Sequence, residues 1–77
     1  MNKERRKRLE RIIDDLDALK SDIESIMDDE EMAMESLPDS LQSSQKYDDM
    51  SDNVQDLNDA QDSIDDAIDY LNEVISR

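Results

Sequence analysis

The sequence predicts an all-α fold, a coiled-coil-like antiparallel hairpin of two helices that dimerises into a four-helix bundle. Apolar residues recur in alternating steps of three and four along two long segments, the period of helices packed side by side. The chain has no glycine and a single proline, Pro38, near its middle, which leaves room for one turn. We therefore expect one domain over residues 1–77, with a helix at about 3–37, a turn at about 38–44 and a second helix at about 45–76.

The first segment keeps an unbroken heptad series of core positions, in which Glu30 is the one polar residue. Ile13, Met27 and Met34 fall beside this series and widen the apolar stripe, while Lys20 interrupts it. A wide stripe favours a packed bundle over a narrow two-stranded seam. The predicted core series consists of Leu9, Ile12, Leu16, Leu19, Ile23, Ile26, Glu30, Ala33 and Leu37.

The connection between the helices is predicted from Pro38 and the residues around it. Proline disfavours helical geometry in the residue before it, so the first helix should end at Leu37. Aspartate and serine follow, and both are favoured in turns and at helix N-caps. Leu41 is the one apolar residue in this connection, and we expect it to tuck under the tip as a plug. The predicted contact residues of the hairpin tip are Glu30, Leu37, Pro38 and Leu41.

The second segment repeats the design of the first, with Gln61 as its polar intruder. Folding back at the turn pairs positions whose numbers sum to about 84, and both apolar series then run out at the same end. One helix covers only part of its partner's wide stripe, so we expect a second hairpin to cover the rest as a homodimer. The second core series consists of Tyr47, Met50, Val54, Leu57, Gln61, Ile64, Ile68, Leu71 and Ile75.

The composition of the chain excludes most kinds of catalytic and metal-binding site. The chain has no His and no Cys, so it has no zinc ligands of the usual kind, no disulfide and no activated nucleophile. The pattern Asp-Asp-x-x-Asp begins at Asp48 and again at Asp65, but it is expected by chance in a chain so rich in aspartate. We therefore expect no enzyme activity, cofactor or metal site. No apolar run approaches the roughly 18 residues of a membrane span, so we expect a cytoplasmic location and no membrane partner.

Acidic residues dominate the second helix. Between Lys46 and Arg77 there are ten carboxylates and no basic residue. Eight of them follow one another in steps of three or four, which places them in one stripe on the outside of the helix. This acidic stripe consists of Asp48, Asp52, Asp56, Asp59, Asp62, Asp66, Asp69 and Glu73.

The acidic stripe admits two interpretations. Each pair of like charges at i,i+4 costs a few tenths of a kcal/mol of helix stability, and aspartate is a poor helix former. A stripe kept despite this cost favours recognition by a partner protein. The chain would then present an acidic rod to a basic nucleic-acid-handling or defence protein, as a nucleic-acid mimic or inhibitor. Alternatively, the chain is a structural or adaptor subunit that binds through its apolar seam and hairpin tip, and the acidity only keeps it in solution.

The first eleven residues carry a net charge of +4 in a chain of net charge −14. Positive charge at a helix N-terminus opposes the helix dipole, so this cluster does not stabilise the helix. It is suited to docking on an anionic surface or on the acidic part of another copy, or to pairing locally with Glu73. The cluster is small and lacks interleaved aromatic residues, so we expect no direct binding of nucleic acid. This predicted basic tip contains Arg5, Arg6, Arg8 and Arg11.

The segment around the turn resembles one found in small acidic helical-hairpin proteins of phages and mobile elements of Gram-positive bacteria. The acidic pair Asp29-Glu30 is followed by x-x-Ala at Ala33, and then by Leu-Pro-x-Ser-Leu-Gln at residues 37–42. Met34 stands where a bulky aromatic residue is expected. The resemblance implies an origin in a phage or mobile element and brings no activity with it.

Overall fold

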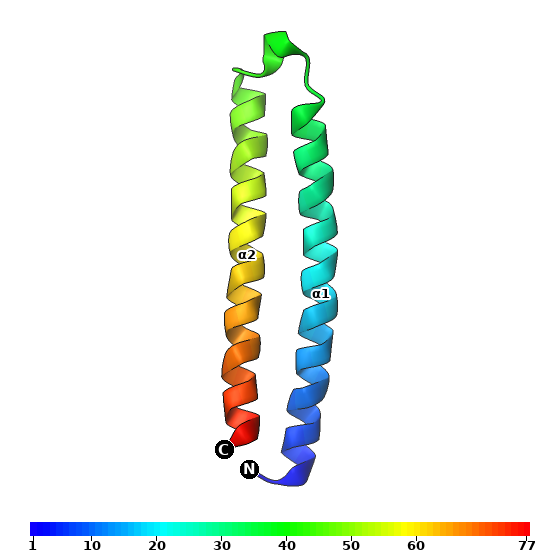
Figure 1. Cartoon of the computed structure of the whole chain (residues 1–77), viewed down its shortest axis with the longest axis vertical. Coiled ribbons are helices and arrows are strands. Elements are labelled where there is room, and N and C mark those ends of the chain that lie inside the picture. The colour runs from blue at the N-terminus through cyan, green and yellow to red at the C-terminus, as the bar shows by residue number, and fades with distance from the viewer.

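The computed structural model describes all 77 residues and confirms the all-α antiparallel hairpin. Helix α1 spans Lys3–Glu35, a single 3₁₀ turn, η1, spans Asp39–Leu41, and helix α2 spans Gln45–Ser76. The two long helices lie side by side in a rod of 60 × 15 × 12 Å, with both termini at the end opposite η1 (Figure 1).

Polar side chains cap the ends of the helices. The Asn2 Oδ1 accepts a hydrogen bond of 2.9 Å from the backbone N–H of Arg5 at the start of α1. The end of α1 lies two residues before the predicted Leu37, and the N–H and hydroxyl of its C-cap residue, Ser36, both donate to the Met32 carbonyl. At the start of α2, the Ser44 Oγ accepts from the N–H of Tyr47 at 3.4 Å. Each cap satisfies backbone groups that a helix end leaves unpaired.

Helix α2 faces α1 with the series that the sequence predicts, while α1 is turned about its axis relative to the prediction. The prediction placed Ile12, Leu19, Ile26 and Ala33 in the seam, but all four are exposed, the first three at 45%, 55% and 57%. The prediction was wrong because α2 covers only one half of the wide apolar stripe. The half-buried residues of α1 are instead Leu9, Ile13, Leu16, Lys20, Ile23, Met27, Glu30 and Met34, and Leu37 just after the helix is half-buried too.

The interior of a single hairpin is thin. Only Gln61 and Ile68 are buried, with 8% and 9% of their surface exposed. The Gln61 Nε2 donates weakly to the Met27 Sδ at 3.4 Å and to the Leu57 carbonyl at 3.5 Å. Its side chain therefore leans back along α2 toward the turn, the direction in which helical side chains tilt.

Leu41 does not plug the tip, contrary to the prediction. It is 43% exposed and closes η1, whose backbone is held by a 2.8 Å hydrogen bond from the Leu41 N–H to the Pro38 carbonyl. That turn lies beyond the ends of the two helices (Figure 1), and Leu41 is exposed there.

Candidate protein-binding surfaces

Two contacts between the helices mark the two sides of the hairpin. On one side the Lys20 Nζ lies 2.7 Å from the Asp65 Oδ1, and on the other the Asn53 Nδ2 donates to the Glu30 Oε2 at 3.0 Å. The residue numbers in these pairs sum to 85 and 83, close to the predicted 84. In an antiparallel pair, each helix has one row of residues on either side of the seam. The row on one side of the first helix lies beside the row on the same side of the second helix. Each side of the hairpin therefore combines one row from each helix.

The side marked by Lys20 and Asp65 is the acidic face. Its row on α1 consists entirely of exposed carboxylates, and its row on α2 is polar. The hydrogen bond that Lys20 donates to Asp65 raises the pKa of Lys20 above its ordinary value, and the charges of Asp17 and Glu24 add to this effect. The acidic face consists of Glu10, Asp17, Glu24 and Glu31 on α1, with Ser51, Asn58, Asp65 and Asn72 on α2.

The side marked by Glu30 and Asn53 is the apolar face. It contains no carboxylate in its two rows, although the chain has 23 acidic residues. Three of the four side chains on α1 are large and the side chains on α2 are smaller, and Asn53 is the single polar member. The apolar face consists of Ile12, Leu19, Ile26 and Ala33 on α1, with Asn53, Ala60, Ala67 and Val74 on α2.

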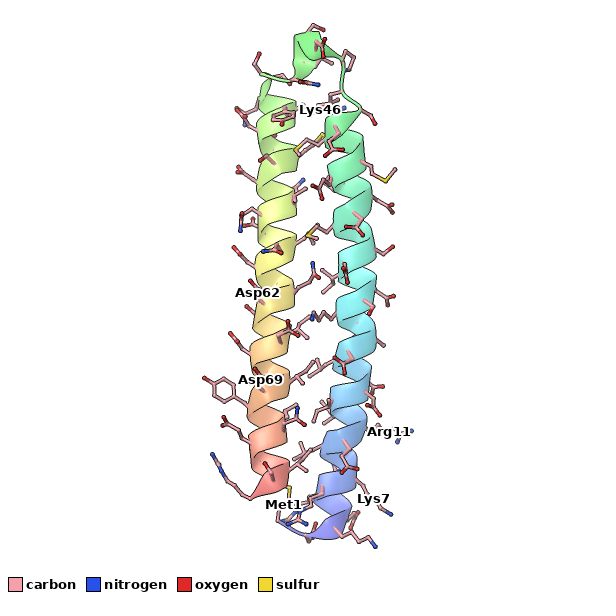
Figure 2. All side chains as sticks on the ribbon, in the orientation of Figure 1. Met1, Lys7, Arg11, Lys46, Asp62 and Asp69 are labelled. Carbon is pink, nitrogen blue, oxygen red and sulfur yellow. The ribbon has the colours of Figure 1, made fainter.

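The predicted acidic stripe lies on the outside of α2. All eight of its residues are exposed, and Asp62 marks the side of α2 turned away from α1 (Figure 2). Glu73 pairs with Arg77 at 3.9 Å, and the only other ion pair of the chain is Lys20–Asp65. Seven carboxylates of the stripe therefore have no cation within 4.0 Å.

The predicted tip residues do not form one cluster. Glu30 is half-buried and bonded across to Asn53, and the Leu37 carbonyl accepts a 3.3 Å hydrogen bond from the Gln42 side chain. Pro38 and Leu41 are exposed at the turn itself. Only these last two are presented at the end of the rod.

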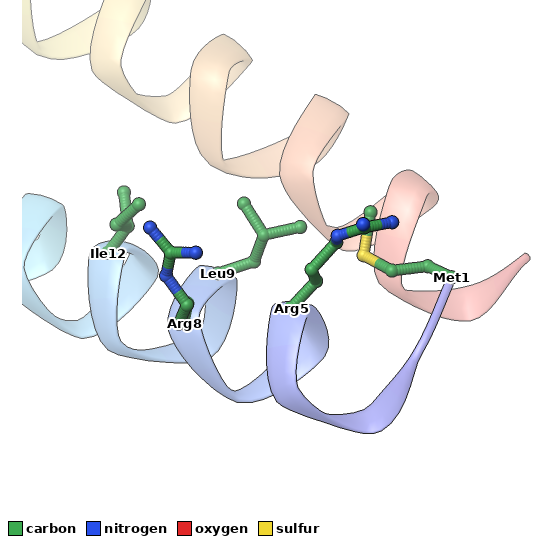
Figure 3. Close-up of a pocket in the computed structure, with 5 residues that line it drawn as sticks. All are labelled: Met1, Arg5, Arg8, Leu9 and Ile12. Atoms are coloured by element: carbon green, nitrogen blue, oxygen red, sulfur yellow. The ribbon is translucent and has the colours of Figure 1, made fainter.

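The predicted basic tip also divides. Arg5 and Arg8 line an open hollow together with Met1, Leu9 and Ile12, at the start of the apolar face (Figure 3). The other two, Arg6 and Arg11, are exposed outside this hollow, and Arg11 projects away from α2 (Figure 2). None of the four pairs with Glu73, whose partner is Arg77.

Sequence reasoning missed Asn53 and misassigned the apolar face. The signal for Asn53 was its place in a row of small apolar residues at seven-residue spacing, opposite the polar Glu30.

No three acidic side chains converge closely enough to hold a metal ion, at either Asp-Asp-x-x-Asp pattern or elsewhere. Neither helix has an apolar stretch long enough to span a membrane. Comparison of the chain with protein-family models, curated proteins and solved structures finds no match.

Proposed function

We propose that this protein is a non-enzymatic protein-binding module that presents an acidic rod to a protein with a basic surface, as a nucleic-acid mimic or inhibitor. The observation that supports this most directly is the absence of counter-charges along the acidic stripe. Seven of its eight carboxylates have no cation partner within the chain.

The placement of charge along the rod adds to this support. Residues 22–62, the half nearer the turn, hold 14 carboxylates and one lysine, a net charge of −13. The other half holds eight basic and nine acidic residues, a net charge of −1. A surface that only needed hydration would mix lysine with glutamate and gain i,i+4 pairing. Concentrated acidity of one sign steers a basic partner toward the rod instead.

The spacing of the stripe is compatible with a groove that binds nucleic acid. At 1.5 Å per residue, steps of three and four repeat a carboxylate about every 5 Å along the axis. That repeat is of the same order as the phosphate spacing along one strand of a duplex. The nucleic-acid-handling or defence identity of the partner, and a phage or mobile-element origin, remain predictions.

Two variants with equal net charge test whether a basic protein recognises the acidic stripe. The stripe variant replaces Asp56, Asp59, Asp62 and Asp66 by Asn. Its matched control replaces four aspartates of α1 by Asn, namely Asp14, Asp15, Asp28 and Asp29. Each immobilised variant is compared with the original chain for retention of basic proteins from the native host, with duplex DNA as competitor and circular dichroism as the check on folding.

The stripe hypothesis expects the stripe variant alone to lose the retained protein, and duplex DNA to displace it from the original chain. Equal loss from both variants would assign the binding to net charge. Unchanged binding by the stripe variant would remove the mimicry proposal.

A second function, a structural or adaptor subunit, is favoured by the exposed apolar residues. Leu19 and Ile26 are more than half exposed, and Leu41 projects at the turn. In this case Leu41→Asn would abolish partner binding while the stripe variant would retain it. Both functions include the homodimer predicted from the sequence, which would place two acidic stripes on one four-helix bundle.

A further inference from the structure

We propose that the apolar face binds the same face of a second copy of this chain, with the two turns at opposite ends of the resulting four-helix bundle. This deepens the homodimer of the proposed function by naming its surface and its orientation. Seven of the eight residues of each acidic stripe lie on the outer side of α2 and stay accessible in such a dimer, while Asp56 shares the row of Ser63 beside the apolar face.

The apolar face is continuous across both helices. Ile12 lies level with Val74, Leu19 with Ala67, and Ile26 with Ala60, and the residue numbers of every pair sum to 86. That sum is close to the 85 and 83 of the two polar contacts between the helices, so the two rows run in register along the rod. Seven positions of the face are therefore apolar along one strip of surface, and Asn53 completes it.

The apolar residues of both helices point toward the centre of a bundle rather than only toward each other. Two series of residues lie between the seam and the apolar face. One runs from Leu9 to Leu37 and the other from Met50 to Val74, both in alternating steps of three and four. Together they hold 17 residues, of which 15 are apolar. The two exceptions, Glu30 and Asn53, are hydrogen-bonded to each other at 3.0 Å. This bond engages one oxygen of Glu30 and one amide N–H of Asn53, so the hairpin already pairs part of the only polar surface in these rows.

The strip is large enough for a stable interface. From Ile12 to Ala33 it extends about 32 Å at 1.5 Å per residue, across two helices that are each about 10 Å wide. Such a strip covers roughly 640 Å², within the range of about 600–1,000 Å² that a stable interface buries on each partner. The whole chain exposes 5758 Å² and buries only two residues by itself, so a second copy would supply most of its interior.

Charge decides the orientation of the second copy. Turns at the same end would bring together two halves of net charge −13 each, whereas turns at opposite ends place each beside a half of net charge −1. The hollow that Met1, Arg5 and Arg8 line (Figure 3) would then face the other copy's turn. That turn offers the carboxylate of Asp39 and the exposed Leu41. In this arrangement Leu19 lies near Ile26 of the second copy, and Ala60 near its Ala67.

Sedimentation equilibrium tests the surface. The original chain should sediment as a dimer of about twice its 9.0 kDa mass at micromolar concentration. Leu19→Asp with Ile26→Asp should raise the dimer dissociation constant about 100-fold or more, because two large apolar contacts per copy are lost and charges are placed in the interface. The matched control, Ser25→Asp with Met32→Asp, adds the same charges on the exposed outer side of α1 and should leave the mass unchanged.

Cysteine crosslinking tests the orientation and does not depend on a destabilising change. The chain has no cysteine, and Ser63 lies at mid-height beside the apolar face. With turns at opposite ends, Ser63→Cys meets its own counterpart and should form a disulfide-linked dimer. Ser51→Cys, on the acidic face, should stay uncrosslinked.

Three results would overturn the inference. They are a folded monomer of the original chain at micromolar concentration, equal dissociation of both double-aspartate variants, and crosslinking of Ser63→Cys only to a second chain carrying Asp22→Cys. The last result would place the turns at the same end. None of them bears on partner binding by the acidic stripe, which the asparagine variants measure separately.

Discussion

Asn53 donates a 3.0 Å hydrogen bond to Glu30 across the two helices, at the edge of the apolar face. Each of these residues is the polar exception in an otherwise apolar series of its own helix. The pairing joins them at one level of the rod, so neither side chain faces an apolar neighbour without a partner.

Replacing Asn53 by Ala should lower the free energy of unfolding by about 0.5–1 kcal/mol, because the Glu30 carboxylate loses its donor in an exposed hydrogen bond. The double variant Glu30→Leu/Asn53→Leu should recover this loss, since it removes both polar groups together. Urea unfolding at a fixed chain concentration measures both changes. Additive losses in the double variant would show that the two residues do not act as a pair.

Gln61→Leu should stabilise the fold by roughly 1 kcal/mol. Gln61 is 8% exposed, but its amide makes only two weak contacts, to the Met27 sulfur and to the Leu57 carbonyl. Burying this amide costs more than such contacts return, and leucine fills a similar volume. A lower urea midpoint for Gln61→Leu would show that the amide contributes net stability.

Ser44→Ala should destabilise the protein by about 1 kcal/mol, because Ser44 caps α2. Its hydroxyl accepts from the Tyr47 N–H and donates to the Leu41 carbonyl. Ser43→Ala is the matched control, since Ser43 is exposed and its side chain makes no hydrogen bond. Thermal unfolding should separate the two variants, and equal melting temperatures would contradict the capping role.

The contact between Lys20 and Asp65 predicts a loss of stability at high pH. The pKa of Lys20 is higher in the folded chain than in the unfolded chain, because Asp65 favours the charged ammonium. The pair therefore stabilises fully below about pH 10.5, the ordinary lysine pKa, and this contribution disappears as pH rises through the higher folded value. Unfolding across pH 8–12 should show this loss in the original chain relative to Lys20→Met, which lacks the group. Parallel curves for the two proteins would refute it.

Salt should act in opposite directions on the fold and on binding of a basic partner. Raising the ionic strength from about 0.01 M to 0.15 M shortens the screening length from about 30 Å to 8 Å. Repulsion within a chain of net charge −14 is then reduced, so the melting temperature and the dimer fraction should rise. Attraction of the acidic stripe to a basic protein should fall over the same range. A melting temperature that falls with salt would contradict this account.

The period of the apolar residues was sufficient to predict two helices, their antiparallel pairing and the face that α2 turns toward α1. It could not choose which edge of the wide stripe on α1 would meet α2, because Ile12 and Ile13 both belong to that stripe. The choice involves cross-helix contacts that period does not encode, such as Lys20 with Asp65 and Met27 with Gln61. Leu41 was misplaced for a related reason, since a 3₁₀ turn held by backbone hydrogen bonds fixes its position regardless of its hydrophobicity.

The uneven placement of charge along the 60 Å rod also makes a single hairpin an electric dipole aligned with its long axis. In the field of a basic surface such a molecule experiences a torque, which turns the end bearing η1 toward that surface before contact. Two copies with opposed turns would cancel this dipole. A lone hairpin would then approach end-on, whereas the pair would have no leading end and would approach along its length.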